Sequence, residues 1–79
     1  MKEKRYKNMG KLLKAKRNEK GYTQNDVAKL IGCDRTTYTY YENGKIVPSV
    51  FTIYKMAGIL RIHYKELFDV LYMDYLEGD

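Results

Sequence analysis

Two short segments of this sequence each begin with a helix-capping residue and end at a glycine, and a very short gap separates them. In the first, Thr23 stands three residues before Asp26, the arrangement of a capping box, and Gly32 follows the last apolar residue. In the second, Asp34 is a favourable N-cap and Gly44 closes the segment. This pattern predicts two short helices joined by a tight turn, in which Gly32 supplies a positive φ.

Apolar residues at helical spacing predict three further helices. One covers about 6–20 and ends at Gly21, a fourth helix starts at Pro48-Ser49, and a fifth starts at Tyr64. We therefore expect an all-α fold, a compact bundle of five short helices with the capped pair at its centre.

The second helix of the capped pair, about 35–43, is the third helix along the chain and is rich in threonine and tyrosine. Residues 36–41 therefore also have the composition of a strand. The caps on both sides favour a helix. Nine tyrosines interleaved with Lys and Arg also suggest stacking on single-stranded nucleic acid, but several lie on apolar stripes, so we favour core packing. The tyrosines that lie on predicted apolar stripes are Tyr6, Tyr38, Tyr41, Tyr64 and Tyr72.

A chain of 79 residues is too short to form two units that each bury a separate core. We expect one domain over 1–79, with a core of about 6–68, a helical extension over 69–79 and no separate sensor module. No apolar run approaches the roughly 20 residues of a membrane span. The basic N-terminus lacks the apolar segment of a secretory signal, so we expect a cytoplasmic protein.

The sequence offers no constellation for catalysis or metal binding. A lone cysteine, Cys33, cannot form an internal disulfide, and with the lone His63 it does not give the spacing of a metal site. Without a nucleophile–base pair or a Gly-rich phosphate loop, we expect no enzyme, no cofactor, no metal and no small-molecule ligand. Cys33 is either a half-covered turn residue or a redox sensor activated by a cation such as Arg35.

Charge is distributed unevenly along the chain. Residues 1–35 contain eleven Lys or Arg and four acidic residues. Residues 62–79 contain one Lys and five acidic residues. A protein whose basic face meets a phosphate backbone has this polarity, and a solvated lysine-rich segment is the alternative.

Several positions occur at spacings shared with a known family. They are Gly21, Thr23-Gln24, Ala28, Gly32, Glu42-Asn43-Gly44 and Pro48-Ser49. With these motifs the chain resembles, over roughly 9–68, the Cro and lambda-repressor-like (XRE) helix-turn-helix family. The resemblance implies a lambda-repressor-like DNA-binding domain. It also implies a sequence-specific transcriptional regulator, a repressor, that binds a two-fold operator in double-stranded DNA as a homodimer through the major groove.

The outward face of the expected third helix is free of aliphatic residues. Arg35 is suited to a bidentate contact with guanine O6 and N7, and Thr36 or Thr39 to a hydrogen bond or a methyl contact. The resemblance places Tyr40 where family members often touch a base or a sugar. We therefore predict base contacts from Arg35, Thr36, Thr39 and Tyr40.

The resemblance also supplies contacts that position the protein without specifying a sequence. Phosphate contacts are assigned to Gln24, Thr37, Asn43 and Lys45. Arg17 and Glu42 match a pair that forms a partly buried salt bridge in some family members, and we expect them to be structural.

Four residues depart from the family pattern. Asp34 is a sound N-cap, but its carboxylate repels phosphate unless it accepts from a cytosine N4 amino group. Lys16 replaces an apolar residue, Arg61 replaces a glycine at the end of the fourth helix, and His63 replaces the usual N-cap of the fifth.

An apolar stripe on the acidic last helix exceeds what a small core needs. We expect it to form the dimer interface, with Leu67, Phe68, Leu71, Tyr72, Tyr75 and Leu76. Two alternatives stay open: Tyr72 and Leu76 fold back on the chain's own core, or the stripe binds a different protein. In the latter case the chain is an antitoxin-like or adaptor module, with DNA binding secondary.

Overall fold

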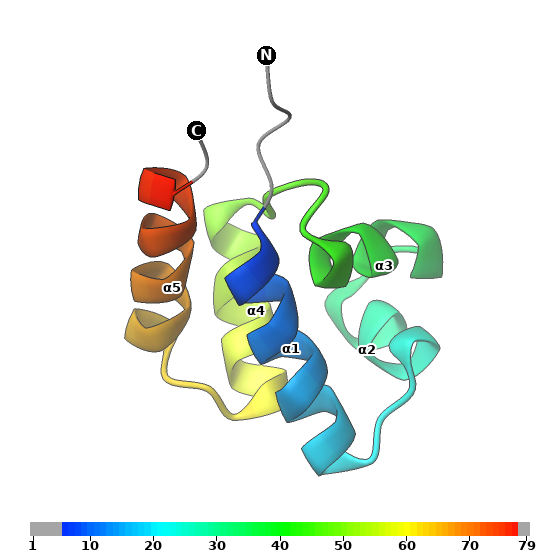
Figure 1. Ribbon diagram of the computed structural model, residues 1–79. Helices are drawn as coiled ribbons and strands as arrows, with labels where there is room; N and C mark the ends of the chain where they lie inside the picture. The colour runs from blue at the N-terminus through cyan, green and yellow to red at the C-terminus, as the bar shows by residue number, and fades with distance from the viewer. Residues whose placement is uncertain (1–5, 78–79) are drawn as a thin grey trace.

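The computed structural model describes residues 6–77, and these form five helices and no strand (Figure 1). The helices are α1 (Lys7–Lys20), α2 (Gln24–Ile31), α3 (Arg35–Asn43), α4 (Val50–Leu60) and α5 (Tyr64–Glu77). The predicted all-α bundle of five helices is confirmed. Part of the basic N-terminal segment, 1–5, and the end of the expected extension, 78–79, lie outside the described residues.

Local capping signals set most of the helix ends. The capping box of Thr23 and Asp26 forms at the start of α2, and Ser49 caps α4 by accepting from the N–H of Thr52 at 3.2 Å. Gly21 and Gly32 end α1 and α2 in the left-handed conformation, with φ of 77° and 81°. The chain therefore leaves α1 and α2 where the sequence predicts.

The corner between α4 and α5 keeps its geometry despite two unusual residues. Arg61 adopts the left-handed conformation, with φ of 56°, that a glycine takes more readily. The imidazole Nδ1 of His63 accepts a hydrogen bond from the backbone N–H of Lys65 at 3.1 Å. Both departures from the family pattern thus preserve the chain path.

The core gathers apolar side chains from all five helices and from the α4–α5 corner. Tyr38 and Tyr41 are buried and meet edge to face, with 6.4 Å between ring centroids. Tyr6 is half-buried against this core. Core packing was wrong for Tyr64, which is 48% exposed, and Tyr72 is 61% exposed and does not fold back on the chain's own core. The reason is that α5 lies at the edge of the bundle and packs on α1 and α4 (Figure 1).

Helix α1 lies between α3 and α5 (Figure 1) and packs on both. Against α3 the backbones approach so closely that a Cβ at Gly10 would overlap the carbonyl oxygen of Glu42. Only glycine fits there, so this crossing fixes the position of α3 on α1.

On its other side α1 is held by an acidic residue of α5. Asp74 is 3% exposed, and its carboxylate accepts from the backbone N–H of Asn8 at 3.1 Å and of Met9 at 2.8 Å. Tyr6, the N-cap residue of α1, provides no side-chain cap. Asp74 therefore satisfies N–H groups that the first turn of α1 leaves unpaired.

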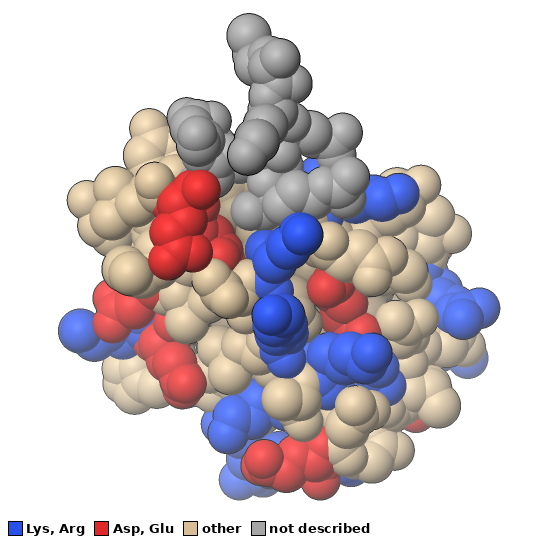
Figure 2. All heavy atoms as spheres, in the orientation of Figure 1, with Lys and Arg blue, Asp and Glu red and all other residues tan. Residues whose placement is uncertain are grey.

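On the face seen in Figure 2, basic side chains gather over α1 and acidic side chains lie over α5. Within residues 6–77, no helix combines the length and hydropathy needed to cross a membrane.

Candidate nucleic-acid interface

The turn between α2 and α3 holds the two helices at a defined angle. Gly32 ends α2, and the carboxylate of Asp34 caps α3 by accepting from the N–H of Thr37 at 2.8 Å. This hydrogen bond keeps the pKa of Asp34 below its ordinary value. Asp34 is therefore an ionised cap at neutral pH. Burial raises the pKa of the Cys33 thiol in the same turn, which argues against a redox role for it.

Helix α3 has a buried face and a solvent face. Tyr38 and Tyr41 point into the core, whereas the other side leaves four side chains exposed and one half-buried. The exposed residues are Arg35, Thr36, Tyr40 and Asn43, and Thr39 is half-buried between them and the body of the protein. The structure thus brings together on one surface all four residues predicted to contact bases.

At the C-terminal end of α3, Tyr40 and Lys45 form a pair. The ammonium of Lys45 lies 5.3 Å from the centroid of the Tyr40 ring, a cation–π distance. A predicted base contact and a predicted phosphate contact therefore lie side by side at this end of the helix.

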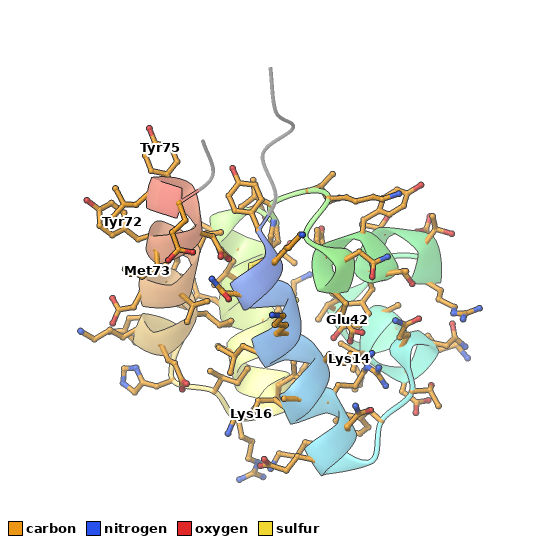
Figure 3. All side chains as sticks on the ribbon, in the orientation of Figure 1. Lys14, Lys16, Glu42, Tyr72, Met73 and Tyr75 are labelled. Carbon is orange, nitrogen blue, oxygen red and sulfur yellow. The ribbon has the colours of Figure 1, made fainter. Side chains whose placement is uncertain are left out.

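Arg17 of α1 and Glu42 of α3 form the ion pair that the sequence suggested. The guanidinium Nε donates to Glu42 Oε2 at 2.6 Å, Nη2 donates to Oε1 at 3.3 Å, and Nη1 donates to the carbonyl oxygen of Tyr22 at 2.9 Å. Glu42 is seen between the helices in Figure 3. Burial opposes its ionisation, but hydrogen bonds from Arg17 and Gln24 hold its pKa below the ordinary value.

The buried phenol of Tyr38 lies near this ion pair. Its oxygen has no hydrogen-bond partner of good geometry within residues 6–77. Burial is the main cause that raises the pKa of this phenol, and the charge of Glu42 adds to it. Tyr38 is therefore a neutral part of the core.

Gln24 lies beside the same ion pair rather than only at the surface. Its amide Nε2 donates to Glu42 Oε1 at 3.0 Å, and its Oε1 accepts from the hydroxyl of Thr39 at 3.1 Å. The sequence suggested a phosphate contact for Gln24 and gave no sign of this link. Such a link depends on the packing of α2 on α3, which residue spacing does not specify.

An open hollow of about 760 Å³ lies between the start of α2 and the start of α3. It is lined by Arg17, Tyr22, Thr23, Gln24, Asn25 and Arg35. N–H groups at the start of α2 and the exposed guanidinium of Arg35 favour an anion in this position, whereas the charge of Arg17 is already balanced by Glu42. The residue pattern did not single out two residues that line this hollow, Tyr22 and Asn25, although the place of Asn25 in the first turn of α2 is a usable signal.

The residues predicted for the dimer interface divide into three groups. Leu67 is 1% exposed and belongs to the chain's own core, so it is not available to a partner. Phe68 and Leu71 are half-buried, while Tyr72, Tyr75 and Leu76 are between 57% and 61% exposed. Figure 3 shows Tyr72 and Tyr75 projecting from α5.

An apolar hollow of about 340 Å³ adjoins this stripe. It is lined by Tyr6, Val47, Phe68, Leu71, Tyr72 and Tyr75. Tyr6 and Val47 come from outside α5, so the spacing of residues on that helix did not reveal them.

Residues 13–67 match the helix-turn-helix family model. The chain belongs to this family of DNA-binding transcriptional regulators. Helices α2 and α3 are therefore the two helices of its helix-turn-helix, and the family is not one of enzymes. No group of residues that could hold a metal occurs in the described part of the chain.

Relatives of this helix-turn-helix protein occur in bacteria, in a bacterial phage and in an archaeon. The ImmF control region 10 kDa protein of Bacillus phage phi105 is 38% identical to this chain. The matched segment covers 71% of this chain and 62% of the phage protein. The HTH-type transcriptional regulator YqaF of Bacillus subtilis is 41% identical over 77% of this chain and 80% of its own length. The chain spans about half, 49%, of a second Bacillus subtilis regulator, YonR.

Among solved structures, the restriction-modification controller protein C.AhdI from Aeromonas hydrophila has the same fold. The two chains superpose with a TM-score of 0.72 and 34% sequence identity, over 78% of this chain and 90% of the controller. The likeness extends beyond the helix-turn-helix to most of the bundle.

Proposed function

We propose that this chain is a sequence-specific transcriptional repressor that binds a two-fold operator in double-stranded DNA as a homodimer. The observation that carries the proposal is the solvent face of α3, where Arg35, Thr36 and Tyr40 are exposed without an aliphatic neighbour on that face. A helix with such a face fits the major groove of B-DNA. Repression follows when the bound dimer occupies promoter DNA.

Base reading is assigned to Arg35, Thr36, Thr39 and Tyr40. Arg35 is in the first turn of α3 and exposed, which suits a bidentate contact with guanine O6 and N7. The ring of Tyr40 suits a thymine methyl group, and Lys45 beside it suits the neighbouring phosphate.

Backbone contacts are assigned to Gln24, Thr37, Asn43 and Lys45. Gln24 opens α2, and Asn43 and Lys45 are exposed at the end of α3, so these groups flank the base-reading face. The hollow that Gln24 and Arg35 line is the place for one phosphate. These contacts hold the helix in register without adding sequence information.

The homodimer forms through the exposed part of the α5 stripe, Phe68, Leu71, Tyr72, Tyr75 and Leu76. An apolar hollow beside exposed aromatic side chains is the kind of surface that a partner covers. A two-fold arrangement then presents two copies of α3 to half-sites about one helical turn apart. We also propose that residues 1–79 act as one domain in the cytoplasm, where bacterial and phage promoters are found.

The test is a selection from random duplexes at physiological salt with the wild-type protein and with Arg35→Ala. We expect a pseudo-palindrome that loses information at one symmetric position in the variant, since one bidentate pair is worth about 1–3 kcal/mol. Arg61→Ala removes the same charge at the α4–α5 corner and should leave the motif unchanged. An absence of any enriched motif would contradict the proposal.

A second candidate is an antitoxin-like or adaptor module whose α5 binds a different protein. The exposure of Tyr72 and Leu76 favours it. Salt dependence separates the two, because contacts to several phosphates weaken steeply with added salt, whereas an apolar interface responds little.

A further inference from the structure

A line of hydrogen bonds runs from the buried ion pair to the base-reading face of α3. It passes from Arg17 through Glu42 and Gln24 to Thr39. The guanidinium can only donate, and the ionised carboxylate can only accept. The direction of each hydrogen bond in the line is therefore set by the charges at its buried end.

The carboxylate of Glu42 fixes which way the amide of Gln24 faces. Only the amide nitrogen can donate to Glu42 Oε1, at 3.0 Å, so the amide oxygen must face Thr39, at 3.1 Å. A flipped amide would place its oxygen against the carboxylate and leave both without a hydrogen. The hydroxyl of Thr39 must then donate its single hydrogen to Gln24.

Thr39 consequently has lone pairs and a methyl group, but no hydrogen, for a partner outside the protein. Its side chain is half-buried among the exposed residues of α3, with the hydroxyl directed to Gln24. In the major groove, the donors that a lone pair can accept from are the amino groups of adenine N6 and cytosine N4. Guanine O6 and N7 and thymine O4 are acceptors, which this hydroxyl cannot satisfy.

We propose that Thr39 selects adenine or cytosine over guanine or thymine at the base it contacts, and that Gln24 is the positioning residue for this choice. The second hydrogen of the Gln24 amide stays free for a phosphate, so the two roles of Gln24 are compatible. This inference rests on the proposed function, since it concerns the base that Thr39 reads within the operator.

The experiment compares motifs selected from random duplexes by the wild-type protein, Thr39→Val, Gln24→Met and a matched control, Thr36→Val. Valine retains the shape and a methyl group of Thr39 but lacks the hydroxyl. We expect the wild type to prefer adenine or cytosine by about tenfold at one symmetric position. Thr39→Val should lose that preference, and Gln24→Met should admit guanine or thymine there.

Gln24→Met should also weaken binding to every sequence by losing a phosphate contact. That uniform loss is separable from the change of base preference at one position, which a purely structural role would not produce. Because Thr36 is itself assigned to base reading, Thr36→Val should change the preference only at the position that Thr36 contacts and leave the Thr39 position unchanged.

Three results would overturn the inference while leaving the proposed function intact. In the first, the wild type prefers guanine or thymine and Thr39→Val abolishes that preference. In the second, the wild type prefers thymine and Thr39→Val keeps that preference. In the third, neither Thr39→Val nor Gln24→Met changes the motif. If the wild type enriches no motif, the proposed function itself fails, and the inference fails with it.

Discussion

The carboxylate of Asp74 in α5 accepts a hydrogen bond from the backbone N–H of Met9 in α1 at 2.8 Å. The last helix thus caps the first one. A truncation within α5 before Asp74, which would otherwise be the direct test of the dimer stripe, removes this cap as well as the stripe. Point substitutions on the exposed side of α5 are therefore the cleaner test.

Replacing Asp74 should destabilise the fold. Asp74→Ala leaves the N–H groups of Asn8 and Met9 unpaired, so we expect the free energy of unfolding in urea to fall by about 2 kcal/mol. Asp69→Ala removes the same charge from an exposed site on α5 and should cost less than about 1 kcal/mol. Equal effects of the two changes would refute a capping role.

The Arg17–Glu42 pair should make stability depend on pH. The pKa of Glu42 in the fold lies below its ordinary value of 4.5. Its contribution is therefore complete above that value and is lost as the pH falls from there through the lower folded-state pKa. Urea unfolding between pH 3 and pH 7 should show the wild-type advantage over Glu42→Gln shrinking on the acid side. A constant difference across this range would disagree with the ion pair.

Two glycines in helices should respond in opposite directions to alanine. Gly10→Ala forces α1 away from Glu42 and should cost about 1–3 kcal/mol of unfolding free energy. A Cβ at Gly58 in α4 meets nothing within 4 Å, so Gly58→Ala should stabilise by about 0.5–1 kcal/mol. Thermal and urea unfolding of both variants check this, and a tolerated Gly10→Ala would contradict the close crossing.

Arg61 should be improved by glycine. It has φ of 56°, and glycine relieves the crowding that an L side chain meets there, so Arg61→Gly should stabilise by about 1 kcal/mol. Arg61→Ala keeps a Cβ and should gain nothing, which separates conformation from charge. Urea midpoints of the two variants make the comparison.

The exposed side of α5 should control self-association without controlling folding. Tyr72→Glu combined with Leu76→Glu places charges at sites that are 61% and 57% exposed, so the helical signal should persist. Sedimentation should change from dimer to monomer, and affinity for a two-half-site operator should fall by about 100-fold or more. Leu30→Glu, on α2, should leave sedimentation unchanged. A dimer that survives the double change would place the interface elsewhere.

The helices and their ends could be predicted because their signals are local. The capping box at Thr23 and the glycine at Gly32 act within a few residues, so spacing alone reveals them. The exposed face of α3 also followed from helical periodicity, which places Thr36 and Tyr40 opposite Tyr38.

Contacts between distant helices could not be predicted in this way. The apolar stripe on α5 indicated a buried face but not which of its residues the chain's own core covers, so Leu67 was assigned to the dimer interface although it is buried in the core. Asp74, an acid within that stripe, caps a helix near the other end of the chain. The orientation of the Gln24 amide likewise depends on three helices meeting at one point.

Met9 donates its backbone N–H to Asp74 of α5, and the next residue, Gly10, packs against the backbone of Glu42 in α3. A single turn of α1 therefore fixes the position of α3, the helix proposed to read DNA, relative to α5, the helix proposed for self-association. A dimer built through α5 would hold its two reading helices at one separation and one rotation. Inserting one base pair between the half-sites turns them by about 34° relative to each other, at about 10.5 base pairs a turn. Because α1 holds α3 and α5 in fixed positions, the two copies of α3 could not rotate to match this change, and binding should weaken.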